Sequence, residues 1–303
     1  MRFKGLDLNL LVALDILLAE CSVSRAAERL HISQPAASAA LGRLRDYFGD
    51  DLLIQHGKRM IPTSYADSLA PEIRRILAKV DSIILMSSEF DPGKSKRVFR
   101  LMASDYIAAV LIGPAIQRLA EVAPDIQLDI RLPSEQVGIE FERGEIDLVL
   151  TPEEYISPSH PAELLFEEQH VVVGWAGNAL LSGPLTTAEF LDSAHVAVTI
   201  GPGRQSTYAE RHLQSLATGR MVEIYAPSFS VVPWLIIGTQ RLTVMHERLA
   251  QVFAENLPLK IQPLPMVVPS MREMVQYHEA RTHDAGIMWL RQLLHETADG
   301  MSI

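Results

Sequence analysis

The chain has 303 residues, of which 48% are hydrophobic and 21% are charged, values typical of a globular protein with room for two or three domains. It has no run of about eighteen apolar residues and no signal-peptide pattern, so we expect a cytoplasmic protein that does not enter a membrane. Its single cysteine, Cys21, excludes a disulfide within the chain and a cysteine-based zinc cluster.

The net charge of −10 argues at first against a nucleic-acid partner, but the charge is unevenly distributed. Residues 1–87 hold 11 Lys and Arg against 10 Asp and Glu, whereas residues 88–303 hold 16 against 27. The acidic part repels DNA, so DNA binding would come from the first part alone. Because the local basic excess is small, we expect dimerisation to supply further phosphate contacts.

The first elements predict a DNA-reading module. A leucine stripe predicts a helix over Leu6–Glu20 that packs on the next two helices. The stretch Ser22–Tyr47 carries two helical patterns about three residues apart, with Ser22 and Ser33 as capping residues. Small alanines allow the two helices to cross closely, which is typical of a helix-turn-helix with Ser33–Tyr47 as the recognition helix. An ordinary helical hairpin is the alternative.

After that module, short strands over 52–54 and 60–62 predict a wing, whose tip either lies along DNA or is simply solvated. In the recognition helix, Gln34 lies in the first turn, where its amide can reach a base edge. Ser33 and the free backbone N–H groups suit a phosphate. The residues that we expect to contact DNA are Ser33, Gln34, Pro35, Ser38, Arg43, Arg45, Lys58 and Arg59.

A long helical pattern follows over Ser64–Ser88, with Pro71 near its start. Its apolar stripe has no partner nearby in the sequence, which predicts pairing with the same helix of a second subunit. The stretch Ser87–Lys96, SSEFDPGKSK, is typical of a hinge.

From residue 97 onward, strand and helix patterns alternate. We predict strands over 98–103, 126–132, 146–150, 171–175, 195–200, 221–225, 242–245 and 272–278. We predict helices over 106–122 (interrupted at Gly113-Pro114), 136–143, 207–216, 228–238 and 284–296. The first five elements form βαβαβ, which favours a parallel sheet with helices on both faces. Crossings near 167–170 and 268–272 predict two α/β lobes with a cleft between them, as in periplasmic binding proteins.

The predicted fold is therefore α+β overall. It has a winged helix-turn-helix over 1–63, a long linker helix and hinge over 64–96, and a two-lobed α/β domain over 97–303. Lobe 1 takes about 97–167 and 271–303, and lobe 2 about 168–270.

Ligands of open parallel sheets sit past the carboxyl ends of strands, near helix starts. Here those positions offer hydroxyls, an imidazole, backbone N–H groups and an aromatic ring, which suits a small aromatic bearing hydroxyl, nitro or carboxylate groups. The residues expected there are Ser104, Thr151, His170, Thr199, Gly201, Pro227, Ser228 and Phe229. Two alternatives stay open, since Ser104 also suits a helix cap and His170 a buried structural histidine. Trp175, Trp234 and Trp289 are expected in the core.

The stretch AAERLHISQPAASAALGRLRDYFGDDLLIQHGKRMIPT resembles the N-terminal domain of LysR-type transcriptional regulators, and the resemblance extends along the whole chain. The start, MRFKGLDLNLLVALD, and the stretch near Asp91–Phe99 resemble one branch. That branch holds flavonoid-responsive nodulation regulators and regulators of salicylate, nitroaromatic and chlorinated-aromatic breakdown. The resemblance implies a dimer-forming linker helix, a tetramer and an inducer in the cleft. It implies inducer contacts at Ser104, His170, Thr199 and Ser228, although several relatives have His where this chain has Ser228.

We therefore expect a sequence-specific regulator, an activator that responds to a small aromatic effector. Its expected partners are double-stranded promoter DNA, a second copy in a homodimer and then a homotetramer, and RNA polymerase. No metal or cofactor is expected. An enzyme is the first alternative, but the chain has no GxSxG, HExxH or dinucleotide fingerprint. A solute-binding protein is the second, against which the N-terminal 87 residues argue. Inducer identity, operator, activator against repressor, and dimer against tetramer stay open.

Overall fold

A computed structural model describes residues 2–3, 6–57, 59–86, 90–201, 203–216 and 219–301, with side chains left undescribed at 2–3, 78 and 81–86. The chain divides into two compact units, Met1–Ser88 and Glu89–Ile303, which are described separately. Each helix in the described ranges is too short or too polar to cross a bilayer.

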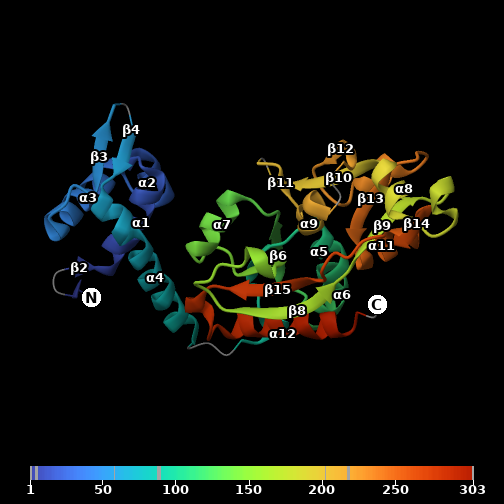
Figure 1. Cartoon of the computed structure of the whole chain (residues 1–303). Helices are drawn as coiled ribbons and strands as arrows, with labels where there is room; N and C mark the ends of the chain where they lie inside the picture. The colour runs from blue at the N-terminus through green and yellow to red at the C-terminus, as the bar shows by residue number, and fades with distance from the viewer. Residues whose placement is uncertain are drawn as a thin grey trace. The chain divides into compact units, whose positions relative to one another are not determined.

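The N-terminal unit is a set of helices with a two-stranded hairpin (Figure 1). Its elements are β1 (Arg2–Phe3), β2 (Leu6–Asp7), α1 (Leu8–Glu20), α2 (Val23–Arg29), α3 (Gln34–Phe48), β3 (Leu53–His56), β4 (Arg59–Pro62) and α4 (Ser64–Met86). The helix-turn-helix is confirmed, and Ser22 and Ser33 cap α2 and α3 as predicted. The first helix begins two residues later than predicted, because Asp7 accepts the N–H of Asn9 and caps it.

Apolar faces hold these helices together. Leu14 and Leu17 of α1 and Leu44 of α3 are fully buried in one cluster, and each such leucine contributes about 1.5–3 kcal/mol. Ala26 is also fully buried, so α2 can approach its neighbours closely. Helix α3 ends at Gly49, whose φ of 66° is the left-handed conformation that glycine adopts without strain.

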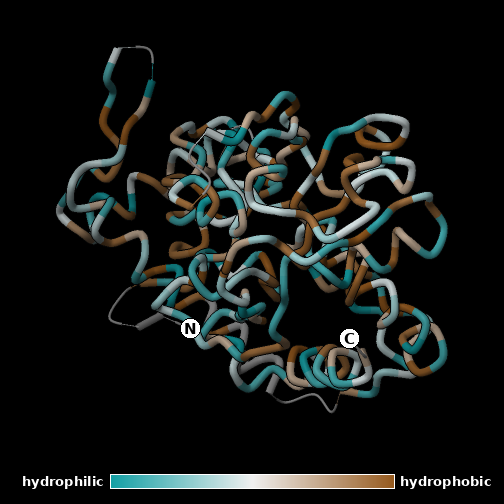
Figure 2. Tube along the Cα trace, turned by 45° about the vertical axis from the view of Figure 1, so that its right-hand side comes forward, coloured by the Kyte–Doolittle hydropathy of each residue, from teal (hydrophilic) through white to brown (hydrophobic). Residues whose placement is uncertain are grey.

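The hairpin of β3 and β4 is hydrophilic towards its tip and hydrophobic near its base (Figure 2). Both strands are longer than predicted, because their pairing extends to His56 and Arg59. Leu53 at the base is fully buried in the same cluster as the helices. The helices therefore position the hairpin.

Helix α4 packs its first turns on α1. Ala66, Ala70 and Ile73 are buried, and Arg74 pairs with Asp15 at 2.9 Å. The helix runs to Met86 without interruption at Pro71.

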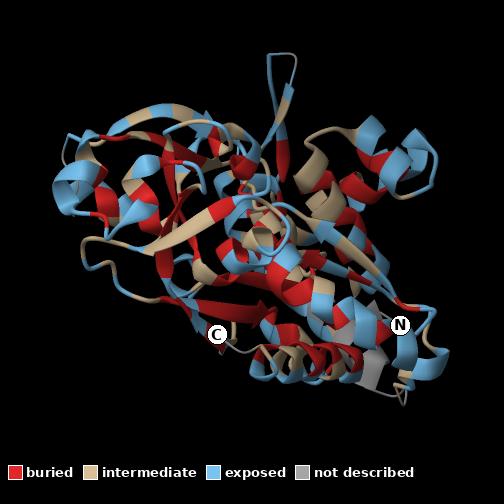
Figure 3. Cartoon of the chain, turned by 90° about the vertical axis from the view of Figure 1, so that its right-hand side faces the viewer, coloured by how far each residue is buried: buried red, intermediate tan, exposed pale blue. Residues whose placement is uncertain are grey.

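The C-terminal unit begins with a five-stranded sheet in the order β6-β5-β7-β15-β8 (Figure 1). Its strands are β5 (Val98–Met102), β6 (Gln127–Arg131), β7 (Leu148–Pro152), β8 (Ala162–Glu168) and β15 (Met271–Tyr277). Its α-helices are α5 (Asp105–Ile107), α6 (Gly113–Val122), α7 (Glu135–Glu142) and α12 (Ala285–Asp299). In α12 buried and exposed residues alternate along the helix (Figure 3).

Three details of this lobe differ from the prediction. The first three strands are parallel as expected, but β15 pairs antiparallel with both β7 and β8, so the sheet is mixed. Strand β8 was missed because its AELLFEE sequence carries three glutamates and lacks strand alternation. Gly113-Pro114 does not interrupt the helix: a π-helical segment, Ala108–Ile112, leads into α6, whose first turn tolerates the proline.

The second lobe holds a sheet in the order β12-β10-β13-β9-β14, with β11 against the end of β10. Its strands are β9 (His170–Trp175), β10 (Ala194–Ile200), β11 (Gln205–Ser206), β12 (Met221–Ala226), β13 (Leu242–His246) and β14 (Leu259–Pro263). Its helices are α8 (Thr187–Asp192), α9 (Tyr208–Leu216), α10 (Val232–Ile236) and α11 (Glu247–Ala254). The chain passes between the sheets at Gln169 and again over 264–270.

One predicted core residue is wrong. Trp234 in α10 is 69% exposed, because this helix has only five residues and buries Val232, Pro233 and Ile236 instead. Trp289 packs partly buried against the main cluster.

Candidate functional site

The start of α3 presents polar side chains to solvent. The Oγ atom of Ser33 accepts the N–H of Ala36 at 3.4 Å, which caps the helix. Gln34 and Ser38 are exposed, whereas Ala37 between them in the sequence is buried. Pro35 occupies the first turn, where its missing N–H removes no helical hydrogen bond. This arrangement leaves an amide and a hydroxyl free for a groove-facing role.

Gln34 lines a surface depression together with residues of α2 and β4. The depression also involves Ser24 and Arg25 at the start of α2 and Arg59 on β4. The structure thus brings together Gln34 and Arg59, which were predicted separately. Ser24 and Arg25 were missed. Their place in the first turn of α2 was the available signal, since a helix start beside the recognition helix also offers N–H groups to phosphates.

The predicted arginines differ in their surroundings. Arg43 is exposed. Arg45 instead donates from Nε to the carbonyl of Asp51 and from Nη2 to that of Leu53, both at 2.7 Å, and so braces the connection into the hairpin. Arg59 is exposed on β4, and Lys58 lies outside the described residues.

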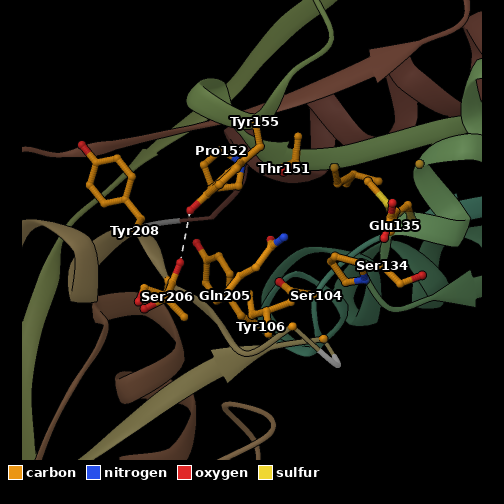
Figure 4. Close-up of a pocket in the computed structure, with 18 of the residues that line it drawn as sticks. Ser104, Tyr106, Ser134, Glu135, Thr151, Pro152, Tyr155, Gln205, Ser206 and Tyr208 are labelled. Carbon is orange, nitrogen blue, oxygen red and sulfur yellow. Dashed lines mark hydrogen bonds between the residues drawn. The ribbon is translucent and has the colours of Figure 1, made fainter.

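A cavity of about 760 Å³ lies between the two lobes of the C-terminal unit. Four predicted residues line it: Ser104, Thr151, Gly201 and Phe229. Four others do not, although they were predicted there: His170, Thr199, Pro227 and Ser228. Sequence reasoning missed most of the polar lining, which includes Tyr106, Glu135, Tyr155, Gln205, Ser206, Tyr208 and Glu273 (Figure 4).

Ser104 and His170 each show the alternative role that the sequence also allowed, a helix cap and a buried histidine. The Oγ atom of Ser104 accepts the N–H of Ile107 at 3.3 Å, so this residue caps α5 while lining the cavity. His170 is buried beside the cavity, with its ring stacked on Tyr208 at 5.7 Å between centroids. Burial lowers the pKa of His170 to about 4, so the ring is uncharged at neutral pH.

Aromatic and acidic groups form the deepest part of the cavity. The Tyr106 hydroxyl donates to Glu168 at 2.5 Å, and the Tyr106 ring stacks on His246 at 3.7 Å. Burial raises the pKa of Glu168 and, together with the Glu168 charge, raises that of Glu273 well above its ordinary value. Burial lowers the pKa of His246 well below its ordinary value. The floor therefore favours uncharged forms of its acids and its base.

Contacts beside the cavity connect the two lobes. The Tyr155 hydroxyl points across to the second lobe and donates to the carbonyl of Ser206 at 3.4 Å (Figure 4). Arg211 of α9 pairs with Glu154, and its guanidinium lies 4.7 Å from the centroid of the Tyr155 ring. These groups belong to different lobes, so their contacts connect the two lobes.

Known proteins match both parts of the chain. A family model described as bacterial regulatory helix-turn-helix protein, lysR family, matches residues 8–67, and one described as LysR substrate binding domain matches residues 92–299. The chain is 40% identical over 301 residues to Nodulation protein D 2 of Rhizobium tropici, covering 99% of this chain and 96% of that protein. It is 38% identical over 303 residues to Nodulation protein D of Azorhizobium caulinodans, covering 100% and 96%.

Solved structures agree. A probable transcriptional regulator from Pseudomonas aeruginosa superposes with a TM-score of 0.64 at 28% identity, covering 99% of this chain and 98% of that one. Full-length OxyR from the same organism gives a TM-score of 0.73, covering 98% and 96%, and at 17% identity it shows the fold alone.

Proposed function

The chain belongs to the LysR family of DNA-binding transcriptional regulators, and from this premise we propose that α3 reads promoter DNA while the interlobe cavity binds a small aromatic inducer. The observation that supports inducer binding is the interlobe cavity itself. Its volume of about 760 Å³ and its aromatic lining, from Tyr106, Tyr155, Tyr208 and Phe229, suit a ligand with more than one ring.

For DNA binding, we assign the base-reading role to Gln34 and a supporting role to Ser38. Both side chains are exposed on α3. Ser33, Pro35, Arg43, Arg45, Lys58 and Arg59 are assigned to positioning on the phosphates. Arg45 is the weakest of these assignments because its guanidinium already serves two carbonyls.

For inducer binding, we keep Ser104, Thr151, Gly201 and Phe229, and we add Tyr106, Gln205 and Tyr208 from the cavity lining. His170 is assigned a supporting role, since its ring stacks on the ring of Tyr208, which lines the cavity. Thr199, Pro227 and Ser228 are not among the lining residues and receive no contact role.

We assign residues 1–63 to DNA binding, 64–96 to a dimerising helix and hinge, and 97–303 to inducer binding. Family members bind DNA and oligomerise. Exposed Ile76 and Tyr65 on α4 support pairing with a second copy, while Ile83 and Ile84 lie outside the residues whose side chains are described. Two such dimers would form the tetramer, which places recognition helices about one DNA turn apart within each dimer.

In this proposal the protein is an activator that acts in the cytoplasm, engages RNA polymerase at a promoter and carries out no chemistry of its own. The inducer shifts the closure of the two lobes, and regulation requires it to bind the open and closed states unequally.

The test combines ligand and DNA binding. The full chain is screened by thermal shift against hydroxyflavones, salicylates, nitrobenzoates and chlorophenols, where a ligand at a hundred times its Kd stabilises by about 2.7 kcal/mol. The same protein is then titrated with its own upstream promoter and with random duplex at moderate salt. Equal affinity for both duplexes, whether or not a ligand is present, contradicts the proposal that the protein recognises its promoter. If no ligand stabilises the protein, the proposed inducer site is contradicted.

A further inference from the structure

The cavity lining contains acidic side chains but no basic ones among the residues described, apart from one histidine. Its ionisable carboxyls are Glu135, exposed at the rim, and Glu273, buried at the floor. Among the described lining residues there is no lysine or arginine. The lining imidazole, His246, is fully buried with a pKa well below its ordinary value, so it is uncharged at neutral pH. A ligand carboxylate would find no cation in this lining.

The helix starts around the cavity give no compensation. Helix N-termini normally attract anions, but α5, α7 and α9 each carry an acidic residue in the first turn. These are Asp105, Glu135 and Glu210. The Asp105 carboxylate also accepts the N–H of Ser230 at 2.7 Å. The positive ends of these helices are therefore already neutralised by the chain itself.

Glu273 stands out within this lining. It lies in β15 between β7 and β8, opposite Pro152 and Phe166, and is 1% exposed. Its Oε1 atom has no hydrogen-bond partner among the residues that the structure describes. The neighbouring Glu168 carboxylate already accepts the hydroxyl of Tyr106. A buried polar atom without a partner costs about 1–3 kcal/mol, so a ligand that satisfied it would gain that interaction.

The protonation state of Glu273 decides which ligand can satisfy it. Burial and the charge of Glu168 both raise the pKa of Glu273, which favours the protonated carboxyl. The side chain then has an O–H to donate as well as an oxygen that accepts.

We propose that the Glu273 carboxyl is the polar anchor of the inducer, donating a hydrogen bond to an acceptor oxygen of an uncharged aromatic ligand and rejecting ligands that carry a carboxylate at that end. This rests on the proposed role of the cavity as the inducer site. A ligand carboxylate in the same place would lose its hydration in a buried site whose described lining holds no cation, and burying an unpaired charge is strongly unfavourable.

The experiment measures Kd values for two matched probes, 7-hydroxyflavone and a flavone carboxylate, on the full-length protein at pH 7. The wild-type protein is expected to bind the uncharged probe at least about ten times more tightly, a ratio that corresponds to about 1.4 kcal/mol. Glu273→Leu should weaken 7-hydroxyflavone by about 3- to 10-fold, since it removes one neutral hydrogen bond. Glu273→Gln keeps an uncharged donor at this position, so it should hold the Kd values of both probes within about 3-fold of the wild-type values.

Two control variants separate this proposal from the one on which it rests. Glu121→Gln removes an exposed carboxyl of α6 outside the cavity lining and should leave the ratio of the two Kd values unchanged. Gly138→Phe fills the cavity from α7, where an added Cβ meets no atom within 4 Å, and should abolish binding of 7-hydroxyflavone. Binding that survives Gly138→Phe overturns the inducer site itself.

The anchor alone is overturned under either of two results. One is equal affinity of the wild-type protein for both probes, and the other is an unchanged Kd for 7-hydroxyflavone in Glu273→Leu while Gly138→Phe still abolishes binding. A wild-type protein that does not bind 7-hydroxyflavone overturns the proposal as well. Loss of fold is checked by melting temperature, which should not fall in Glu273→Leu because an unpaired buried carboxyl is replaced by an apolar side chain.

Discussion

Replacing Gln34 by alanine tests whether α3 reads bases. The side chain is exposed in the first turn of α3, and the cap from Ser33 to Ala36 does not depend on it. Alanine is a good helix former, so the free energy of unfolding should change by less than about 0.5 kcal/mol. Any loss of DNA recognition can then be assigned to the missing amide.

The expected loss follows from the chemistry of a glutamine on a base edge. A bidentate contact of this kind is worth about 1–3 kcal/mol of discrimination against the wrong base. A symmetric dimer makes the contact twice, so the preference for the operator should fall by about 2–6 kcal/mol, or about 30-fold at the least. Affinity for random duplex should stay the same, because phosphate contacts supply it.

The assay is fluorescence anisotropy with operator and scrambled duplexes of equal length, at several salt concentrations. Arg43→Gln serves as the matched contrast in the same helix. It should weaken both duplexes alike and reduce the slope of log K against log salt by about one per subunit. If the ratio between operator and scrambled duplex is the same in Gln34→Ala as in the wild-type protein, α3 does not read bases through this residue.

Three further predictions concern the C-terminal unit. Ser104→Ala should raise the Kd of the inducer by up to about 10-fold without changing operator affinity, measured by calorimetry, because the hydroxyl both lines the cavity and caps α5; an unchanged Kd would exclude Ser104 from the site. Arg97→Met removes the nearer of the two arginines that pair with the buried carboxylate of Asp284, at 2.6 Å as against 3.6 Å for Arg281, and should cost about 3 kcal/mol in urea denaturation. A cost under about 1 kcal/mol would contradict this. Because the pKa of His170 is about 4 when folded and 6.5 when free, the unfolded chain binds the proton first, and stability present above pH 6.5 is lost as the pH falls towards 4. His170→Phe keeps the ring against Tyr208 and should remove up to about 3 kcal/mol of that loss, so a variant with the wild-type pH dependence of unfolding would refute the argument.

Local chemistry along the chain determines the DNA-binding unit. Its signals are a serine cap, a proline in the first turn and apolar residues every three or four positions, all of which act within one or two helical turns. Ser22 and Ser33 accordingly cap their helices as the sequence predicts. Arg45 marks the limit: nothing near it in the sequence indicates that its guanidinium reaches the carbonyls of Asp51 and Leu53.

The ligand cavity is decided by tertiary structure, because its walls come from segments far apart in the chain. The sequence marks strand ends, and this suffices for Ser104 and Thr151. Glu273 could not be found in that way, since it belongs to a strand that enters the first sheet antiparallel only after the chain has built the second lobe. The position of His170 at the crossing predicted a place in the cavity lining, but pairing with β13 and β14 turns the ring towards Tyr208 instead. The residue types along the chain determine which functional groups are available. Only the pairing of distant strands determines which of these groups lie close together.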